Sequence, residues 1–229
     1  MKVKFALFGI GLALLAVVLQ GCGPSDTERV KKLVLPLDRT KTLGEAFDKW
    51  NGCKQKEWKE FKTEQGQRMV EFTCSSSAES EVGAMLLDYL VKEGSLARRV
   101  QAYMTAKGKT VSAQEAEKMG KAACEIKEDI LTIQFTFTKD DNSVQIAGAS
   151  DTVKWKDGKS SEPGKEDPGA MLNAVYGDDA ASDLGDLKEL LQRSTFDKDK
   201  EGQKGRIEVK DMQVNDYLKG FLEAYEKAK

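Results

Sequence analysis

The segment WKEFKTEQGQRMVEFT, residues 58–73, predicts a β-hairpin and starts the argument for the fold. Two runs with strand character flank residues 64–66, a three-residue loop whose glycine suits the left-handed position of a type I turn with a bulge. This register places Trp58 opposite Phe72, a favourable cross-strand pair. A two-residue loop would instead set two glutamates against each other. We therefore expect the three-residue loop.

A second hairpin is predicted further along the chain. Residues 131–137 alternate Leu, Ile and Phe with Thr and Gln, the pattern of a strand with one buried face and one hydroxyl-rich face. Polar residues 139–142 turn the chain back into a strand over 143–150, and Val153 and Trp155 continue the sheet. Two hairpins in sequence predict an antiparallel meander.

Amphipathic helices are expected around these strands. Thr42 with Glu45, and Ser112 with Glu115, have capping-box spacing and predict helix starts; the second helix should reach Cys124. Helical-period stripes of apolar residues between the hairpins predict further helices, with their apolar faces buried in the core. The fold class is therefore α+β, antiparallel β-hairpins or a meander packed on amphipathic helices.

The chain after the sheet is expected to be helical. Residues 156–169 are almost free of apolar side chains and predict a mobile loop or linker. Beyond them, apolar spacing predicts a helix over 184–191 and a C-terminal helix over 217–225, capped by Asn215 or Asp216. This C-terminal region is either a small subdomain or an appendage on the same core.

The N-terminal sequence predicts that the protein is exported and attached to a membrane. Lys2 and Lys4 precede an apolar run over residues 5–19, which is long enough for a secretory signal but short of a membrane span. Leu19-Gln20-Gly21-Cys22 then resembles the lipobox of bacterial lipoproteins, in which the cysteine is acylated and the chain is cut before it. Gly23, rather than Asp, after Cys22 implies by the same resemblance the outer membrane of a Gram-negative cell.

The cysteines fit an oxidising compartment. In the predicted hairpin register Cys74 lies opposite Lys56, so Cys53, three residues upstream, can fold back and form a disulfide with it. Cys124 would then be a free, buried thiol at a helix end. No histidine is present to activate it as a nucleophile.

Several segments of the chain body together carry a second resemblance: Thr42–Phe47, Trp58–Phe61, Gly66, Val70–Thr73, Leu131–Phe137, Val144–Ile146 and Met171–Tyr176. With these segments the chain is similar to a recurring module of uncharacterised bacterial envelope lipoproteins, in which a later hairpin and a short helix ending in Tyr complete the sheet. The resemblance implies no catalytic or binding residues.

Composition excludes several functions. The absence of histidine excludes serine–histidine and cysteine–histidine catalysis. The formal net charge is −2 with both signs interspersed, so nucleic acid is not an expected partner. Carboxylate chemistry stays possible, and a hydrolase of that kind should bring two acids into one cleft, one of them with a raised pKa.

One acidic loop has the spacing of a calcium site. Counted from Asp197, oxygen ligands fall at positions 1, 3, 5 and 12 with glycine at position 6, as in an EF-hand; the ligands would be Asp197, Asp199, Glu201 and Glu208. Five basic residues crowd the segment, one of them the lysine at position 8, and they oppose cation capture. We expect millimolar affinity at best.

The sequence as a whole predicts a lipid-anchored, non-enzymatic interaction or structural module of the outer membrane that faces the periplasm or the cell surface. Its expected partners are the membrane, through the lipid on Cys22, and an envelope protein bound at an apolar or aromatic patch beside Trp50 and Trp155. No cofactor is expected. The expected divisions are a signal over 1–21, a tether over 22–32, an α+β core over 33–155, a linker over 156–169 and a helical region over 170–229.

Overall fold

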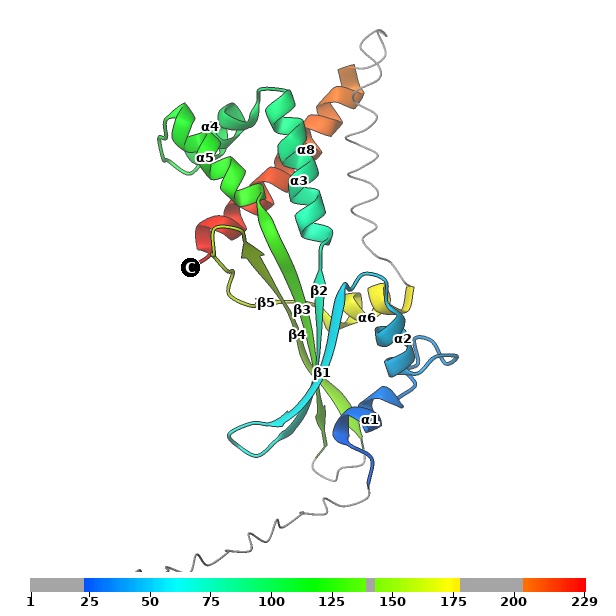
Figure 1. The fold of residues 1–229 in the computed structure, drawn as a ribbon. Coiled ribbons are helices and arrows are strands. Elements are labelled where there is room, and N and C mark those ends of the chain that lie inside the picture. The colour runs from blue at the N-terminus through cyan, green and yellow to red at the C-terminus, as the bar shows by residue number, and fades with distance from the viewer. Residues whose placement is uncertain (1–22, 139–142, 178–203) are drawn as a thin grey trace, which may run out of the picture.

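An antiparallel sheet forms the centre of the protein (Figure 1). The computed structural model describes residues 23–138, 143–177 and 204–229. The five strands follow the order β1-β2-β3-β4-β5, so each strand pairs with the one before it in the chain. Their bounds are β1 Gln55–Lys62, β2 Arg68–Ser76, β3 Ile126–Phe137, β4 Val144–Trp155 and β5 Gly164–Lys165. This topology confirms the predicted meander and the α+β class.

Seven helices accompany the sheet in the described ranges. They are α1 Asp26–Lys31, α2 Leu43–Lys49, α3 Ala78–Lys92, α4 Leu96–Ala106, α5 Ala113–Cys124, α6 Pro168–Gly177 and α8 Lys204–Lys227. The capping boxes predicted at Thr42 and Ser112 are both present, each with reciprocal hydrogen bonds to the glutamate three residues on. The sequence signals for helix starts therefore hold at α2 and α5.

The first hairpin has the predicted register. Trp58 lies opposite Phe72, and Gly66 has a φ of 79° in the loop between β1 and β2. A residue with a Cβ rarely adopts this left-handed conformation, so the glycine sets the loop length. The loop length in turn sets which side chains face the core.

The second hairpin is longer than predicted. β3 begins at Ile126, five residues before the alternating segment, and β4 continues without a break to Trp155. Charged residues at the start of β3 hide the alternation there. Pairing with β2 on one side and β4 on the other fixes the backbone of this stretch, for example Ser75 opposite Ile130.

The core has two parts, and the helices divide between them (Figure 1). In the α1–α2–α6 cluster, Phe47 of α2 packs edge-on against Phe72 of β2, with ring centroids 4.6 Å apart. In the α3–α4–α5–α8 cluster, helices surround Ile126 and Trp155 at the other end of the sheet. Both clusters use helical stripes as packing surfaces, as the sequence predicts.

Residues 156–169 differ from the expected linker. Gly164 and Lys165 form β5 on the edge of β4, and the backbone of Ser160 exchanges hydrogen bonds with that of Lys229, at 3.0 and 3.1 Å. The amide of Ser161 also donates to the carbonyl of Val153. Backbone pairing needs no apolar side chains, so composition alone did not reveal it.

The C-terminal helix starts earlier than expected. α8 runs from Lys204 to Lys227, so Asn215 and Asp216 lie inside it and cap nothing. The side chain of Asn215 instead accepts a hydrogen bond from Arg99 of α4, at 2.5 Å. Val214 and Leu222 of α8 are both buried against α3, α4 and α5. The C-terminal region therefore shares the core of the preceding helices.

Candidate functional site

The segment expected to be a tether is folded onto the sheet. Residues 26–31 form helix α1, which begins with a capping box between Ser25 and Glu28. Val30 on this helix has no exposed surface and packs in the α1–α2–α6 cluster. A polar composition suggested a free segment, but the cap, the buried side chain of Val30 and contacts with the strands together order this short helix against the sheet.

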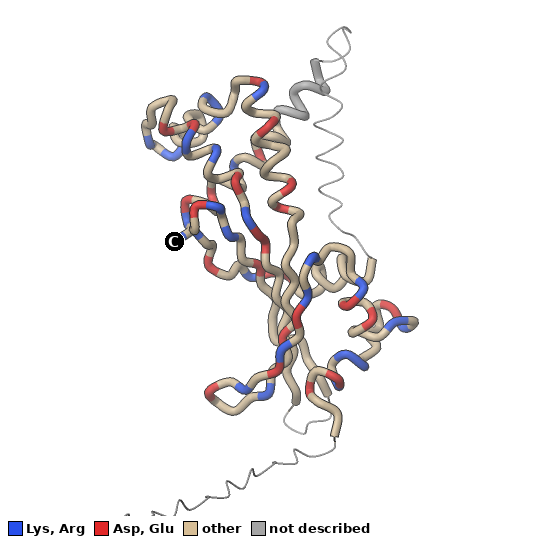
Figure 2. The backbone as a smooth tube through the Cα atoms, in the orientation of Figure 1, with Lys and Arg blue, Asp and Glu red and all other residues tan. Residues whose placement is uncertain are grey.

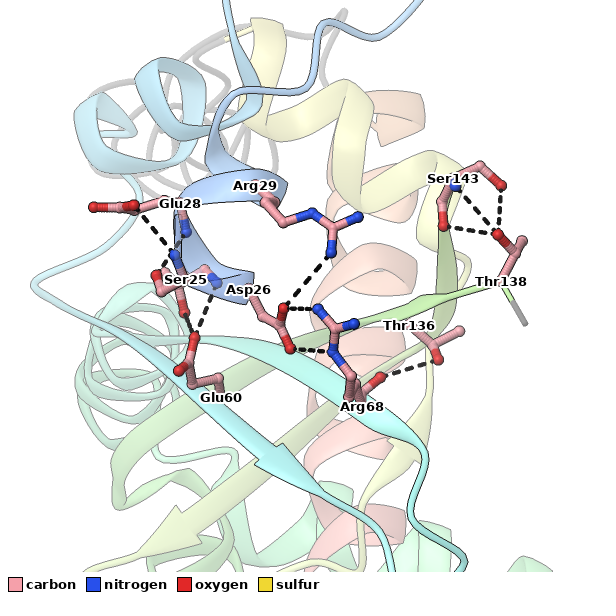
Figure 3. A network of polar contacts seen from close by, with 10 residues as sticks. Ser25, Asp26, Glu28, Arg29, Glu60, Arg68, Thr136, Thr138 and Ser143 are labelled. Carbon is pink, nitrogen blue, oxygen red and sulfur yellow. Dashed lines mark hydrogen bonds and ion pairs between the residues drawn. The ribbon is translucent and has the colours of Figure 1, made fainter. Parts of the chain in front are cut away.

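A polar network holds α1 at the end of the sheet (Figure 3). The guanidinium of Arg68 on β2 forms an ion pair with Asp26 and donates from Nε to Oδ2 at 2.7 Å. The guanidinium groups of Arg29 and Arg68 each lie 4.6 Å from the ring centroid of Phe137. The amide of Thr27 donates to Glu60 of β1 at 3.1 Å. Three strands therefore fix the start of α1.

This docking leaves little chain before the fold begins. Only Gly23 and Pro24 separate Cys22 from Ser25, the N-cap of α1. Cys22 and the signal segment lie outside the described residues, so acylation stays a prediction. Within the described ranges no helix is long and apolar enough to cross a membrane.

The predicted disulfide is present. Cys53 and Cys74 are bonded, with their Cα atoms 5.4 Å apart. Cys74 lies opposite Lys56 in the sheet register, as expected. The bond ties the segment after α2 to β2, and both cysteines pack in the α1–α2–α6 cluster. It therefore joins the first helices to the sheet.

Replacing both bonded cysteines should destabilise the fold. The bond closes a sequence separation of 21 residues, so Cys53→Ser with Cys74→Ser should lower the free energy of unfolding by about 3 kcal/mol in the chain-entropy model. Denaturant unfolding of the wild type and the double variant measures this difference. Cys124→Ser is not a suitable control, because that thiol is buried. The suitable control compares the oxidised wild type with the reduced wild type. Equal midpoints would contradict the prediction.

Cys124 is a free, buried thiol at the end of α5, as predicted. Burial, together with the charge of Glu125, raises the pKa of this thiol to about 12. A thiol with so high a pKa is protonated at neutral pH and is a poor nucleophile.

The tryptophans expected beside an exposed patch are themselves buried. Trp50 is 5% exposed and Trp155 is 1% exposed. Trp155 donates its indole N–H to the carbonyl of Ala123 at 3.0 Å, while the indole N–H of Trp50 has no acceptor in the described chain. An open cavity of about 420 Å³ adjoins Trp50, between α2 and Val175 of α6. Both tryptophan rings are therefore part of the packed core rather than of an exposed patch.

The acidic loop lies almost wholly outside the described residues. Asp197, Asp199 and Glu201 are not described, and Glu208 lies in α8, whose helical backbone begins at Lys204. Calcium binding there stays a prediction. In the part of the chain that the structure describes, no group of three or more acidic, Cys or His side chains is arranged to hold a metal ion.

Asp129 is a buried titratable group that the sequence analysis did not predict. Asp129 of β3 is only 7% exposed, and its Oδ1 has no hydrogen-bond partner within the described chain. Burial, reinforced by the charges of Glu79, Asp151, Glu166 and Glu128 in that order, raises the pKa of Asp129 to about 7. The signal for it was available, because Asp129 occupies the same alternation as Leu131, Ile133 and Phe135.

The neighbouring carboxyls form a cluster across three segments. Asp151 of β4 lies opposite Leu131, two register positions along β3 from Asp129, and Glu166 follows β5. Burial, the charge of Asp151 and a hydrogen bond with Asp151 raise the pKa of Glu166. None of these carboxyls lines the cavity beside Trp50. Acids converge here, and none of them lines the cavity of about 290 Å³ beside Cys124 either.

Residues of both charge signs are interspersed along the described backbone (Figure 2). Lysine and arginine alternate with aspartate and glutamate along both the sheet and the helices.

Comparison with known proteins gives no family, curated relative or solved structure that matches this chain.

Proposed function

We propose that the protein is a lipid-anchored lipoprotein of the outer membrane that faces the periplasm or the cell surface and acts as a non-enzymatic interaction or structural module. The observation that carries the proposal is the order of signals at the N-terminus: two lysines, an apolar run and Leu19-Gln20-Gly21-Cys22. Dual or triple acylation gives stable anchoring where one chain would be marginal.

Two structural features support this proposal. The Cys53–Cys74 disulfide is of the kind that persists outside the reducing cytosol. The docking of α1 means that only two residues, Gly23 and Pro24, would connect the acylated cysteine to Ser25 of the folded domain, and the three Cα–Cα steps span at most about 10 Å. The domain would therefore lie at the membrane surface, with the α3–α4–α5–α8 cluster extending away from the end where the chain enters (Figure 1).

A non-enzymatic role is the proposal that the chemistry favours. The sequence has no histidine, the thiol of Cys124 is buried, and the carboxyl cluster around Asp129 is not joined to the cavity beside Trp50. We further propose an envelope protein as the partner of the module, and crosslinking in intact cells followed by purification would identify it.

Cys22→Ser should abolish the lipid anchor. Without the thiol there is no acyl acceptor, so the chain should appear unprocessed or soluble after cell fractionation, while the wild type sediments with the outer membrane. Gln20→Ser, which leaves the cysteine in place, is the matched control and should fractionate like the wild type. Membrane retention of a processed Cys22→Ser protein would contradict the anchor.

A further inference from the structure

The loop between α1 and α2, residues 32–41 and here named the α1–α2 loop, carries exposed apolar side chains. Val34 is 51% exposed and Leu37 is 49% exposed. In the described chain the other exposed large apolar residues are scattered singly over the fold: Val91, Ile146 and Met212. Single exposed apolar residues need no explanation, but two within four residues, on the first loop after the proposed anchor, form a local surface.

The loop is held in this conformation by its own contacts. Val34 forms a backbone bridge with Thr42, and the amide of Leu43 donates to the carbonyl of Leu33 at 2.6 Å. The carboxylate of Asp38 accepts from the amide and the hydroxyl of Thr40, at 2.8 and 2.6 Å, and these bonds hold the pKa of Asp38 below its usual value.

The apolar side chains of the loop divide between its inner and outer sides. Leu33 and Leu35 pack against the α1–α2–α6 cluster, whereas Val34 and Leu37 face outward. The outward pair is therefore presented without any rearrangement of the loop.

Basic side chains flank the apolar pair. Lys32 and Arg39 are exposed, and neither forms an ion pair within the described part of the chain. The acid of the loop, Asp38, is already engaged by Thr40 and lies 3.9 Å from the amino group of Lys41. Apolar side chains flanked by free cations are the combination that binds an anionic lipid surface. The apolar side chains enter the boundary between headgroups and acyl chains, and the cations contact the phosphates.

We propose that the α1–α2 loop rests in the headgroup layer of the bilayer, with Val34 and Leu37 inserted and Lys32 and Arg39 at the phosphates. This proposal rests on the lipid anchor at Cys22 proposed above. The loop begins ten residues after that cysteine, and α1 between them is docked on the sheet, so the anchor would keep the loop near the membrane at all times. The lipid would hold the protein, and the loop would set its orientation.

Tryptophan quenching by brominated lipid tests the loop directly. Val34→Trp and Val91→Trp are matched probes, because both valines are 51% exposed and Val91 belongs to α3 in the other cluster. The full acylated protein is placed in vesicles of phosphatidylethanolamine and phosphatidylglycerol with brominated acyl chains, and the signal of the native tryptophans is subtracted. Tryptophan at position 34 should lose several times more fluorescence than tryptophan at position 91.

Charge variants give the second arm of the test. Lys32→Gln with Arg39→Gln should reduce the quenching at position 34 in vesicles that contain phosphatidylglycerol, and should change it little in vesicles of phosphatidylethanolamine and phosphatidylcholine alone. Equal quenching at both positions in protein that floats with the vesicles would overturn the loop proposal and leave the anchor intact. Protein that does not float would remove the anchor, and the loop proposal with it. If the tryptophan at position 34 is not quenched by lipid but is shielded by a protein crosslinked to the loop, the loop would be assigned to a protein partner instead.

Discussion

Asp129→Asn is expected to stabilise the protein at slightly alkaline pH by several kcal/mol. In the folded protein the pKa of this buried carboxyl is raised from 3.8 to about 7. At a pH above both values the folded state must hold a buried carboxylate, and the difference of about 3 pKa units corresponds to roughly 4 kcal/mol. The amide of asparagine has nearly the same shape, carries no charge, and can donate a hydrogen bond to the acidic neighbours.

The pH dependence of this effect has a definite sign. The folded state binds the proton of Asp129 more tightly than the unfolded state, so the contribution of this group to stability is fully present below about pH 4. It falls as the pH rises and is lost above about pH 7. The variant should therefore match the wild type near pH 4 and exceed it increasingly up to about pH 8.

Denaturant unfolding at several pH values measures this effect. Asp216→Asn, at an exposed position on α8, is the control and should change stability by less than about 0.5 kcal/mol at every pH. A wild type and an Asp129→Asn variant with parallel pH profiles would show that the carboxyl is ionised freely in the folded protein. That result would contradict the account of the acidic cluster.

Gly83→Ala should destabilise the protein by about 3 kcal/mol, while the same substitution at Gly220 should stabilise it. A Cβ at position 83 of α3 would lie 2.3 Å from the carbonyl oxygen of Cys124, a backbone atom that cannot move aside cheaply. A Cβ at position 220 of α8 would have no heavy atom within 4 Å, so only the better helix propensity of alanine, about 1 kcal/mol, should act there.

Thermal or denaturant unfolding of the two glycine variants side by side measures this contrast. Both substitutions are made inside helices, so the intrinsic gain from alanine is common to them. The expected difference in free energy of unfolding is about 4 kcal/mol. If both variants were stabilised, α3 would not approach the end of α5 as closely as the structure has it.

Local sequence signals predicted much of the fold. The turn glycine Gly66 and the cross-strand pairs around it fixed the register of the first hairpin, and that register led to the Cys53–Cys74 bond. Two capping boxes marked the starts of α2 and α5. Each of these signals acts between residues close in sequence, or across one short turn, and so can be read without knowledge of the fold.

What the sequence did not predict depends on contacts between distant segments. The ion pair of Asp26 with Arg68 orders α1, and the pairing of β5 with β4 orders residues that composition assigns to a linker. Trp50 is buried in a cluster to which α2 and α6 both contribute, and these two helices meet only in the folded chain. Asp129 could have been noticed at an apolar position of its strand, but three of the four acids near it, Glu79, Asp151 and Glu166, lie outside that strand.

Mass spectrometry of the mature N-terminus tests the central proposal most directly. The protein is isolated from membranes of its own cells with detergent and digested, and the first peptide is sequenced. The account predicts a chain that begins at Cys22 and carries the mass of two or more acyl chains on that residue. A mature N-terminus at any other residue, or an unmodified Cys22, would contradict the lipid anchor and with it the proposed place of this protein at the membrane.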